Sequence, residues 1–229
     1  MTKLRYVVVV LTMMTGLGGG AQVPAAHLAG VLTQMDAASA KFQSAEADFQ
    51  WDFFERVTRS TSTQTGTIYF QRRKNASTEM GAKIVTPDLK LLSYKDNALE
   101  VFDPKVNTLL KIDTKKNGAQ VESFLTLGFG GSGRDLEKSW TIKDLGMETV
   151  DGLSAAKLDL VSKDENVRNM FTHVTIWVDL SRDVLLRQEG YTPSEDKRTA
   201  IFKNIKYNVK LDKKPYEIKP NSKTNVTAR

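Results

Sequence analysis

The chain has 229 residues, 40% of them hydrophobic and 26% charged, a balance typical of a globular protein with a real core. The net charge of +6 comes from interspersed Lys, Arg, Asp and Glu rather than from a basic block with aromatic residues, which argues against nucleic acid as a partner. No cysteine is present, so disulfides, thiol chemistry and the lipid anchor of a bacterial lipoprotein are excluded.

The first residues predict an export signal. Lys3 and Arg5 precede an apolar run over residues 6–17, which ends in small residues. We expect a secretory signal peptide over residues 1–21, because the run is too short to be a comfortable membrane span. The rest of the chain, 22–229, is then expected to be one soluble domain exported to the periplasm.

An amphipathic helix is predicted next, from Pro24 to Ala47. Its apolar residues fall near one face and alanines fill much of the rest. These apolar residues are Leu28, Val31, Leu32, Met35 and Phe42. A helix of this kind beside a β domain is a natural lid for an open apolar face.

Short strands with period-2 patterning follow the helix and resume after residue 140. The residues 172–211 read as an antiparallel meander of three strands, in which Ile201, Ile205 and Tyr207 share one parity. The side chains predicted to lie on the apolar face of the sheet are Trp51, Phe53, Ile68, Phe70, Val174, Ile176 and Val178. The polar tail 212–229 is expected to wrap or fray.

Two short helices are expected in the middle of the chain. Phe124 and Leu125 belong to an apolar face within residues 120–127, and residues 135–139 suit another helical turn. The predicted fold class is therefore mainly β, with about ten or eleven antiparallel strands, a long N-terminal helix and short inserted helices.

No catalytic or metal site is visible in the sequence. Gly128, Gly130 and Gly133 satisfy G-x-G-x-x-G, but a helix precedes them instead of the strand that nucleotide binding requires. His27 and His173 are far apart and lack ligand spacing. The carboxylate pairs Asp164-Glu165 and Glu195-Asp196 look like solvated loops. We expect no enzyme activity, no metal and no cofactor.

Arg72 shares its strand side with Ile68 and Phe70. Either its guanidinium points to the aromatic face, or the strand parity shifts at Arg72-Arg73 and the side chain meets water. A buried guanidinium must be hydrogen-bonded, and the last carbonyls of a lid helix are free acceptors. An inward Arg72 would therefore latch a lid over an apolar cavity.

Several segments in order resemble one known family. The F-x-W strand, the G-x-I-Y-F-x-R strand, DGLSAAKLDLV, TIWVDLSRDVLLRQEGY and IFKNIKYN are similar to segments of the periplasmic lipoprotein carrier LolA and its relatives. A late F-x-x-x-P element has its counterpart in Tyr216 to Pro220. The similarity covers essentially all of the chain after the signal.

The resemblance implies an unclosed β half-barrel, lidded by helices, whose cavity accepts the acyl chains of lipoproteins. It also implies that Arg72 holds the lid closed, although Arg73 stands where the family pattern has proline. The implied partners are acylated lipoproteins, an inner-membrane release complex and an outer-membrane receptor, with the carrier itself a monomer.

Two other function classes stay open. The same fold could be a module that senses lipid or lipoprotein without transferring it, or a small enzyme without a cofactor that uses the half-barrel as its pocket. A converging acid/base pair would favour the enzyme, and the sequence shows none. A second domain would favour the sensor, and the chain looks too short for one.

Overall fold

A computed structural model describes residues 23–74, 77–115 and 127–228. Within them, twelve strands form one sheet: β1 (Ser44–Glu55), β2 (Ser60–Arg72), β3 (Thr78–Thr86), β4 (Lys90–Lys95), β5 (Ala98–Asp103), β6 (Thr108–Asp113), β7 (Trp140–Val150), β8 (Leu153–Ser162), β9 (His173–Asp179), β10 (Val184–Tyr191), β11 (Lys197–Tyr207) and β12 (Asn225–Ala228). Their order is β12-β6-β5-β4-β3-β2-β1-β11-β10-β9-β8-β7. All neighbours pair antiparallel except β12 with β6.

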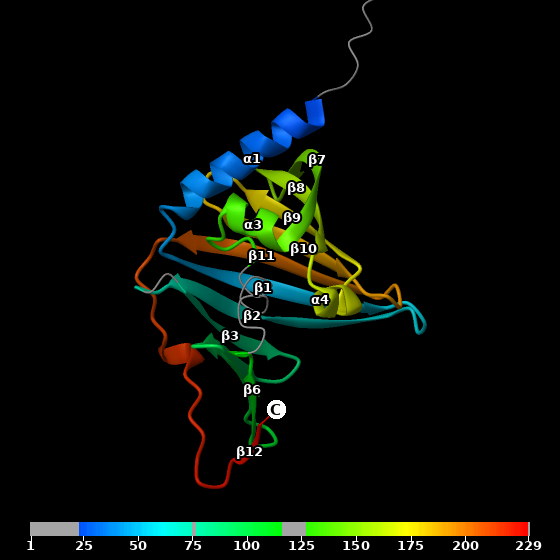
Figure 1. Ribbon diagram of the computed structural model, residues 1–229. Coiled ribbons are helices and arrows are strands. Elements are labelled where there is room, and N and C mark those ends of the chain that lie inside the picture. Colours follow the sequence, from blue (N-terminus) through cyan, green and yellow to red (C-terminus); the bar gives the residue numbers. More distant parts are fainter. Residues whose placement is uncertain (1–22, 75–76, 116–126, 229) are drawn as a thin grey trace, which may run out of the picture.

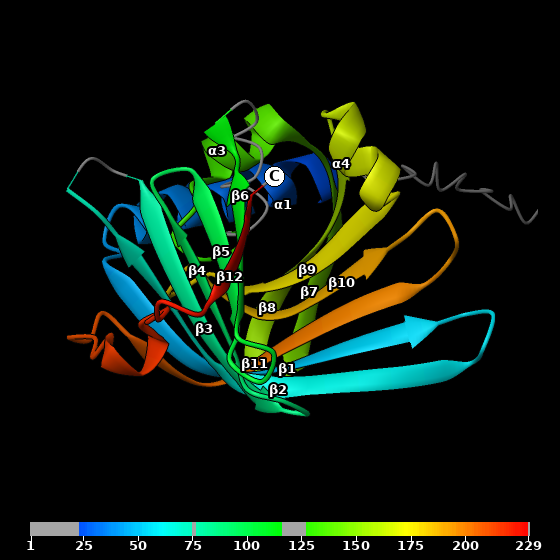
Figure 2. The same cartoon turned by 90° about the horizontal axis from the view of Figure 1, so that it is seen from below.

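The described helices are α1 (Val23–Ser39), α3 (Gly133–Ser139), α4 (Glu165–Met170) and the short 3₁₀ helix η2 (Lys214–Tyr216). Figures 1 and 2 show a strongly curved sheet with α1 and α3 over its concave side. The predicted unclosed antiparallel half-barrel with helices over it is confirmed. No helix in the described part of the chain is long and apolar enough to cross a membrane.

The N-terminal helix is shorter than predicted. It ends at Ser39 instead of Ala47, since tightened bonds from Lys41 N to Ala38 O and from Phe42 N to Ser39 O close its last turn. The following sequence SAEADFQ alternates small apolar and polar residues, the period of a strand, and β1 begins at Ser44. The predicted residues 135–139 lie in α3, whereas the predicted signal peptide and residues 120–126, with Phe124 and Leu125, lie outside the described residues.

The helix α4 was not predicted, because Asp164-Glu165 read as a solvated loop. The carboxylate of Asp164 instead accepts hydrogen bonds from the backbone N–H groups of Asn166 and Val167 and so caps this helix. The tail was also mispredicted in part. Its last described residues form β12, which pairs with β6 at the edge of the sheet.

The parity predicted for the last strand of the meander was wrong. Asn204 adopts a positive φ of 51°, and the β1–β11 register shifts there by one residue. A bulge of this kind moves side chains beyond it to the other face. Phe202, opposite Phe49, therefore faces the concave side and Ile201 faces the convex side, while Ile205 and Tyr207, beyond the bulge, both pack against the main core.

The main core lies on the concave side beneath α1 and α3. Inward residues of β8 and β9 have no exposed surface, and Val31 and Met35 of α1 are each 2% exposed against them. Gly133 of α3 permits this packing, because a Cβ there would lie 2.4 Å from the carbonyl oxygen of Leu32. The helix α1 thus packs tightly over the β7 end of the sheet (Figure 1).

Candidate ligand-binding cavity

An apolar cavity of about 330 Å³ opens on the concave face. The strands β1–β5, β10 and β11 supply most of its wall, and the loop before α3 and the end of α4 supply the rest. The lining residues are Trp51, Asp52, Phe53, Ile68, Phe70, Met80, Leu92, Leu99, Leu127, Phe129, Phe171, Leu185, Gln188, Gly190, Arg198, Thr199, Ala200 and Phe202. This volume lies within the range of about 300–1,000 Å³ that holds small-molecule ligands.

Phe129 forms the aromatic roof of the cavity. Its ring stacks on Phe70 of β2, with centroids 3.9 Å apart and an interplanar angle of 12°, and meets the edge of Phe202 at 5.1 Å. An isolated β-bridge to Val184 and a bond from Gly130 N to Asp183 O fasten this loop to the start of β10. The glycine loop, whose sequence matches a nucleotide-binding pattern, therefore closes the apolar cavity instead.

Arg72 joins β2 to the end of α1 and to the glycine loop. Its Nη1 donates to the carbonyl oxygen of Ser39 at 2.6 Å, and its Nη2 donates to the Ser39 hydroxyl at 3.1 Å and to the carbonyl oxygen of Gly130. The Ser39 hydroxyl donates to the same Gly130 carbonyl at 2.7 Å. The guanidinium also lies 5.8 Å from the ring centroid of Phe42. The side chain thus points inward, and the neighbouring Arg73 pairs with Asp96 at the surface.

The predicted lid residues of α1 lie in the core. Val31, Leu32 and Met35 are buried and Leu28 is half-buried, all packed against the main cluster. Asp36 of α1 forms an ion pair with Arg134 of α3, with 3.0 Å between Asp36 Oδ2 and Arg134 Nε.

The structure divides the predicted cavity residues into two groups. Trp51, Phe53, Ile68 and Phe70 line the cavity. Val174, Ile176 and Val178 face the same side of the sheet but have no exposed surface and do not belong to the lining.

Two polar residues of the lining escaped the sequence reasoning. Arg198 and Gln188 face the cavity from β11 and β10. Arg198 shares its strand parity with Ala200 and Phe202, a signal that could have identified it. It closely follows the pair Glu195-Asp196, which was read as a solvated loop.

Asp183 lies fully buried at the β9–β10 turn, and neither of its carboxylate oxygens has a hydrogen-bond partner. Burial raises the pKa of this carboxyl to about 8. The positive charge of Arg72 lowers that pKa and the negative charge of Asp36 raises it, both less strongly than burial acts. The carboxyl is therefore mostly protonated at neutral pH, directly beside the contacts of Arg72.

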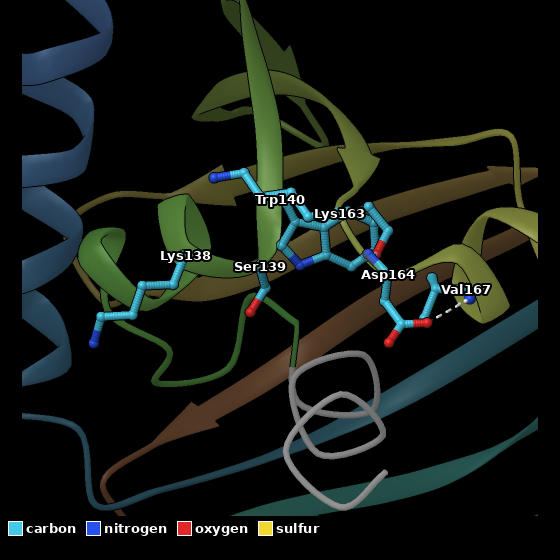
Figure 3. A pocket seen from close by; sticks show the side chains of 7 residues that line it. Lys138, Ser139, Trp140, Lys163, Asp164 and Val167 are labelled. Carbon is cyan, nitrogen blue, oxygen red and sulfur yellow. Dashed lines mark hydrogen bonds between the residues drawn. The ribbon is translucent and has the colours of Figure 1, made fainter.

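A second pocket of about 250 Å³ lies between α3 and α4 (Figure 3). Lys138 donates to Asp135 and Lys163 donates to the carbonyl oxygen of Glu137, so both cations already have partners. Asp164, also in this wall, caps α4. The pocket joins the ends of two helices and lacks the apolar wall of the cavity.

Each histidine pairs with one aspartate. His27 Nδ1 bonds Asp144 at the β7 edge, and His173 Nδ1 lies 2.7 Å from Asp159 and stacks on Tyr191. Among the described residues, no three His, Asp or Glu side chains gather as metal ligands do. The cavity therefore offers mainly apolar contacts, with four polar residues in its wall: Asp52, Gln188, Arg198 and Thr199.

No protein-family model matches the sequence, and no curated protein matches it. Solved structures do resemble it. MucB superposes with a TM-score of 0.55 at 11% identity, covering 85% of this chain, and the chain spans only 64% of MucB. The MucA/MucB complex of Pseudomonas aeruginosa gives a TM-score of 0.52 at 12% identity, covering 84% of this chain and 61% of that one.

An uncharacterized conserved protein from Thermus thermophilus has a TM-score of 0.55 at 11% identity, covering 89% of this chain and 99% of that one. A LolA superfamily protein from Nitrosomonas europaea has a TM-score of 0.41 at 13% identity, covering 83% and 97%. The chain shares its unclosed half-barrel fold with MucB and with the Thermus protein. Similarity at such low identity shows the fold and not the activity.

Proposed function

We propose that this protein is an exported carrier that binds the acyl chains of lipoproteins in its apolar cavity and moves them from the inner to the outer membrane. The observation that carries the proposal is the cavity itself: an apolar space on the concave face, roofed by Phe129. Folding here leaves apolar surface unfilled, which is costly unless a ligand uses it.

The energetics suit an acyl ligand. Each CH₂ moved from water into an apolar site contributes about 0.8 kcal/mol, so a chain of ordinary length supplies enough free energy to bind to a protein in water. A binding site of this kind needs no metal, nucleotide or acid/base pair. The binding energy must stay moderate, because a carrier also has to release its cargo.

Arg72 is the proposed latch. Its bonds to Ser39 and Gly130 tie together the strand, the end of α1 and the roof loop, so opening the roof requires these bonds to break. Bonds from a charged donor contribute about 1.5–3 kcal/mol each, a size that a membrane partner could overcome. The partners that load the carrier at the inner membrane and unload it at the outer membrane would supply that energy.

One observation favours a second candidate, a module that senses lipid or lipoprotein. MucB has a similar fold and is known in a complex with MucA. A sensor would bind the ligand and change its affinity for a protein partner, without moving the ligand between membranes.

Release from spheroplasts of the source bacterium tests the proposal. Purified protein from residue 22 onward should bring acylated lipoprotein into the soluble fraction as a one-to-one complex. Binding of a small lipid without lipoprotein release would favour the sensor, and binding of neither would reject both.

Replacement of the latch sharpens this test. We expect Arg72→Leu to load lipoprotein but to impair its transfer onward, because the roof no longer cycles between two defined states. Arg73→Leu is the matched control, since it removes an adjacent guanidinium that pairs with Asp96 and Glu79 instead of with Ser39 and Gly130. Transfer kinetics that are normal in Arg72→Leu would remove this residue from the mechanism.

A further inference from the structure

The cavity is not apolar throughout: one cation lies in its wall without a partner. Arg198 of β11 stands opposite Phe53 of β1 and Gly190 of β10, and its guanidinium carbon lies 5.2 Å from the Phe53 ring centroid. Its Nη1 is buried and has no hydrogen-bond partner. Its charge acts on the carboxylate of Asp196, but neither a hydrogen bond nor an ion pair joins Arg198 to any residue in the described part of the chain.

This isolation is not a general feature of the arginines here. Arg187 of β10 points to the convex face, where it pairs with Glu189 and lies 5.0 Å from the Trp177 ring. Arg72 has three acceptors at the other end of the cavity. A guanidinium with a buried donor and no acceptor is unfavourable, so Arg198 calls for an acceptor that the protein does not provide.

The surroundings of Arg198 suit a head group of a ligand. Gly190 has no side chain to occupy the space opposite, and a Cβ there would lie 2.8 Å from the Phe171 ring. Gln188, two residues along β10 on the same face, lines the cavity, and its amide makes no hydrogen bond among the described residues. The carboxylate of Asp52, the other charged lining residue, already accepts hydrogen bonds from Thr63 and Gln50.

The strand register gives the distance over which a ligand could extend. Phe70 pairs with Ala45 and Arg198 pairs with Phe53, so the aromatic roof and the cation lie eight residues apart along β1. Eight residues of a strand span about 26 Å. One leaflet of a bilayer core is about 15 Å thick, so an acyl chain fits between the two ends.

From this geometry we infer that the cavity binds an acyl chain whose head is an anion, a carboxylate or a phosphate, held by Arg198 and Gln188 with the tail directed toward Phe70 and Phe129. The inference rests on the proposed function in one respect, that the cavity takes acyl chains. It adds that an anionic group stands at the end of the bound chain that lies farther from Phe70 and Phe129.

Titration of the full protein with a matched series of probes tests this inference. Oleate, oleoyl lysophosphatidic acid and oleyl alcohol share one chain and differ in the head. We expect the two anions to bind about 10–100-fold more tightly than the alcohol, the size expected of charge-assisted hydrogen bonds. The better of the two anions identifies the carboxylate or the phosphate as the natural head.

Variants of Arg198 complete the test. Arg198→Met should remove the preference for anions while changing oleyl alcohol binding less than about twofold, and it should fold, because the lost group makes no bond in the protein. Arg198→Lys should restore part of the preference. Lys203→Met on the same strand removes an equal charge outside the cavity and should change nothing.

Two outcomes would overturn the inference in different ways. Equal binding of all three probes, unchanged in Arg198→Met, would reject the anionic head and leave acyl binding standing. Absence of binding by every probe would reject the acyl cavity of the proposed function as well.

Discussion

The concave face of this sheet has two halves that differ in what covers them. In the filled half, formed by β8 and β9 beneath α1 and α3, the inward residues Leu158, Leu160, Val174, Ile176 and Val178 have no exposed surface. In the hollow half, formed by β1–β5 and β11, Trp51, Phe53, Leu92 and Leu99 remain partly exposed around the cavity. One sheet thus provides both the stability of the domain and an unfilled site.

The comparison teaches that strand patterning does not decide which apolar surface becomes a site. Both halves show inward apolar residues at period 2. The difference arises from α1, which reaches the β7 end and packs there, with its last turn fixed by Arg72 at the border of the cavity. Stability and binding can therefore be changed separately.

Truncating one leucine in each half should give the largest difference between the halves in unfolding free energy. We expect Leu158→Ala in the filled half to cost about 3–4 kcal/mol of unfolding free energy, because it opens a hole in close-packed core. Leu92→Ala in the hollow half should cost less than about 1.5 kcal/mol but weaken acyl binding, since its side chain borders space already empty. Urea unfolding and ligand titration of both variants measure these effects. Equal losses of stability would remove the distinction between the halves.

The border between the halves should respond to pH through Asp183. Its folded pKa of about 8 exceeds the ordinary value of 3.8, so between pH 4 and 8 the folded state holds a proton that the unfolded chain has lost. Asp183 therefore makes the protein less stable as pH rises through this window, by up to about 1.4 kcal/mol per pH unit.

Asp183→Asn should remove that dependence, and asparagine also tolerates the positive φ of 52° at this position. We expect the variant to gain stability relative to the original chain by roughly 2–3 kcal/mol between pH 5 and 7, measured by urea unfolding at each pH. Parallel stability curves for the two proteins would show that Asp183 is ionised in the folded state.

Much of the fold could be predicted from the sequence, because strand period and turn residues are local signals. The inward side of β1 and β2 and the three antiparallel strands of the meander were predicted in this way, but not the inward side of its last strand. The bulge at Asn204 was not, since a single residue in the left-handed region reverses the parity of everything beyond it.

The site was less predictable, because it depends on contacts between distant segments. Val174 and Phe53 both follow the period-2 pattern of an inward strand residue, but Val174 is fully buried and Phe53 lies partly exposed at the cavity. Asp183 reads as a turn aspartate, and its burial follows from packing of the glycine loop of residues 128–131 over it. Arg72 could be singled out because a charged residue broke an apolar strand face.

A smaller effect is expected from the hydroxyl that reinforces the border. Ser39→Ala removes the bond to Gly130 and one of the bonds from Arg72, while the carbonyl of Ser39 still accepts from Arg72. The expected cost is about 1 kcal/mol, with faster hydrogen exchange in the last turn of α1. Thr33→Ala on the same helix is the control, because its hydroxyl bonds only Ala29 of its own exposed turn. Similar exchange in both variants would argue against a special role for Ser39.

The smallest effect should come from the ion pair between α1 and α3. Arg134 bonds Asp36, but its side chain is 80% exposed, and pairs so open to water contribute at most about 0.5 kcal/mol. If apolar packing holds α1 on the filled half, Arg134→Ala should lower the unfolding free energy by no more than this. Added salt should reduce the difference in unfolding free energy between the variant and the original chain further. A loss above about 1.5 kcal/mol would mean that charge rather than packing decides where α1 lies, and with it which half of the sheet stays hollow.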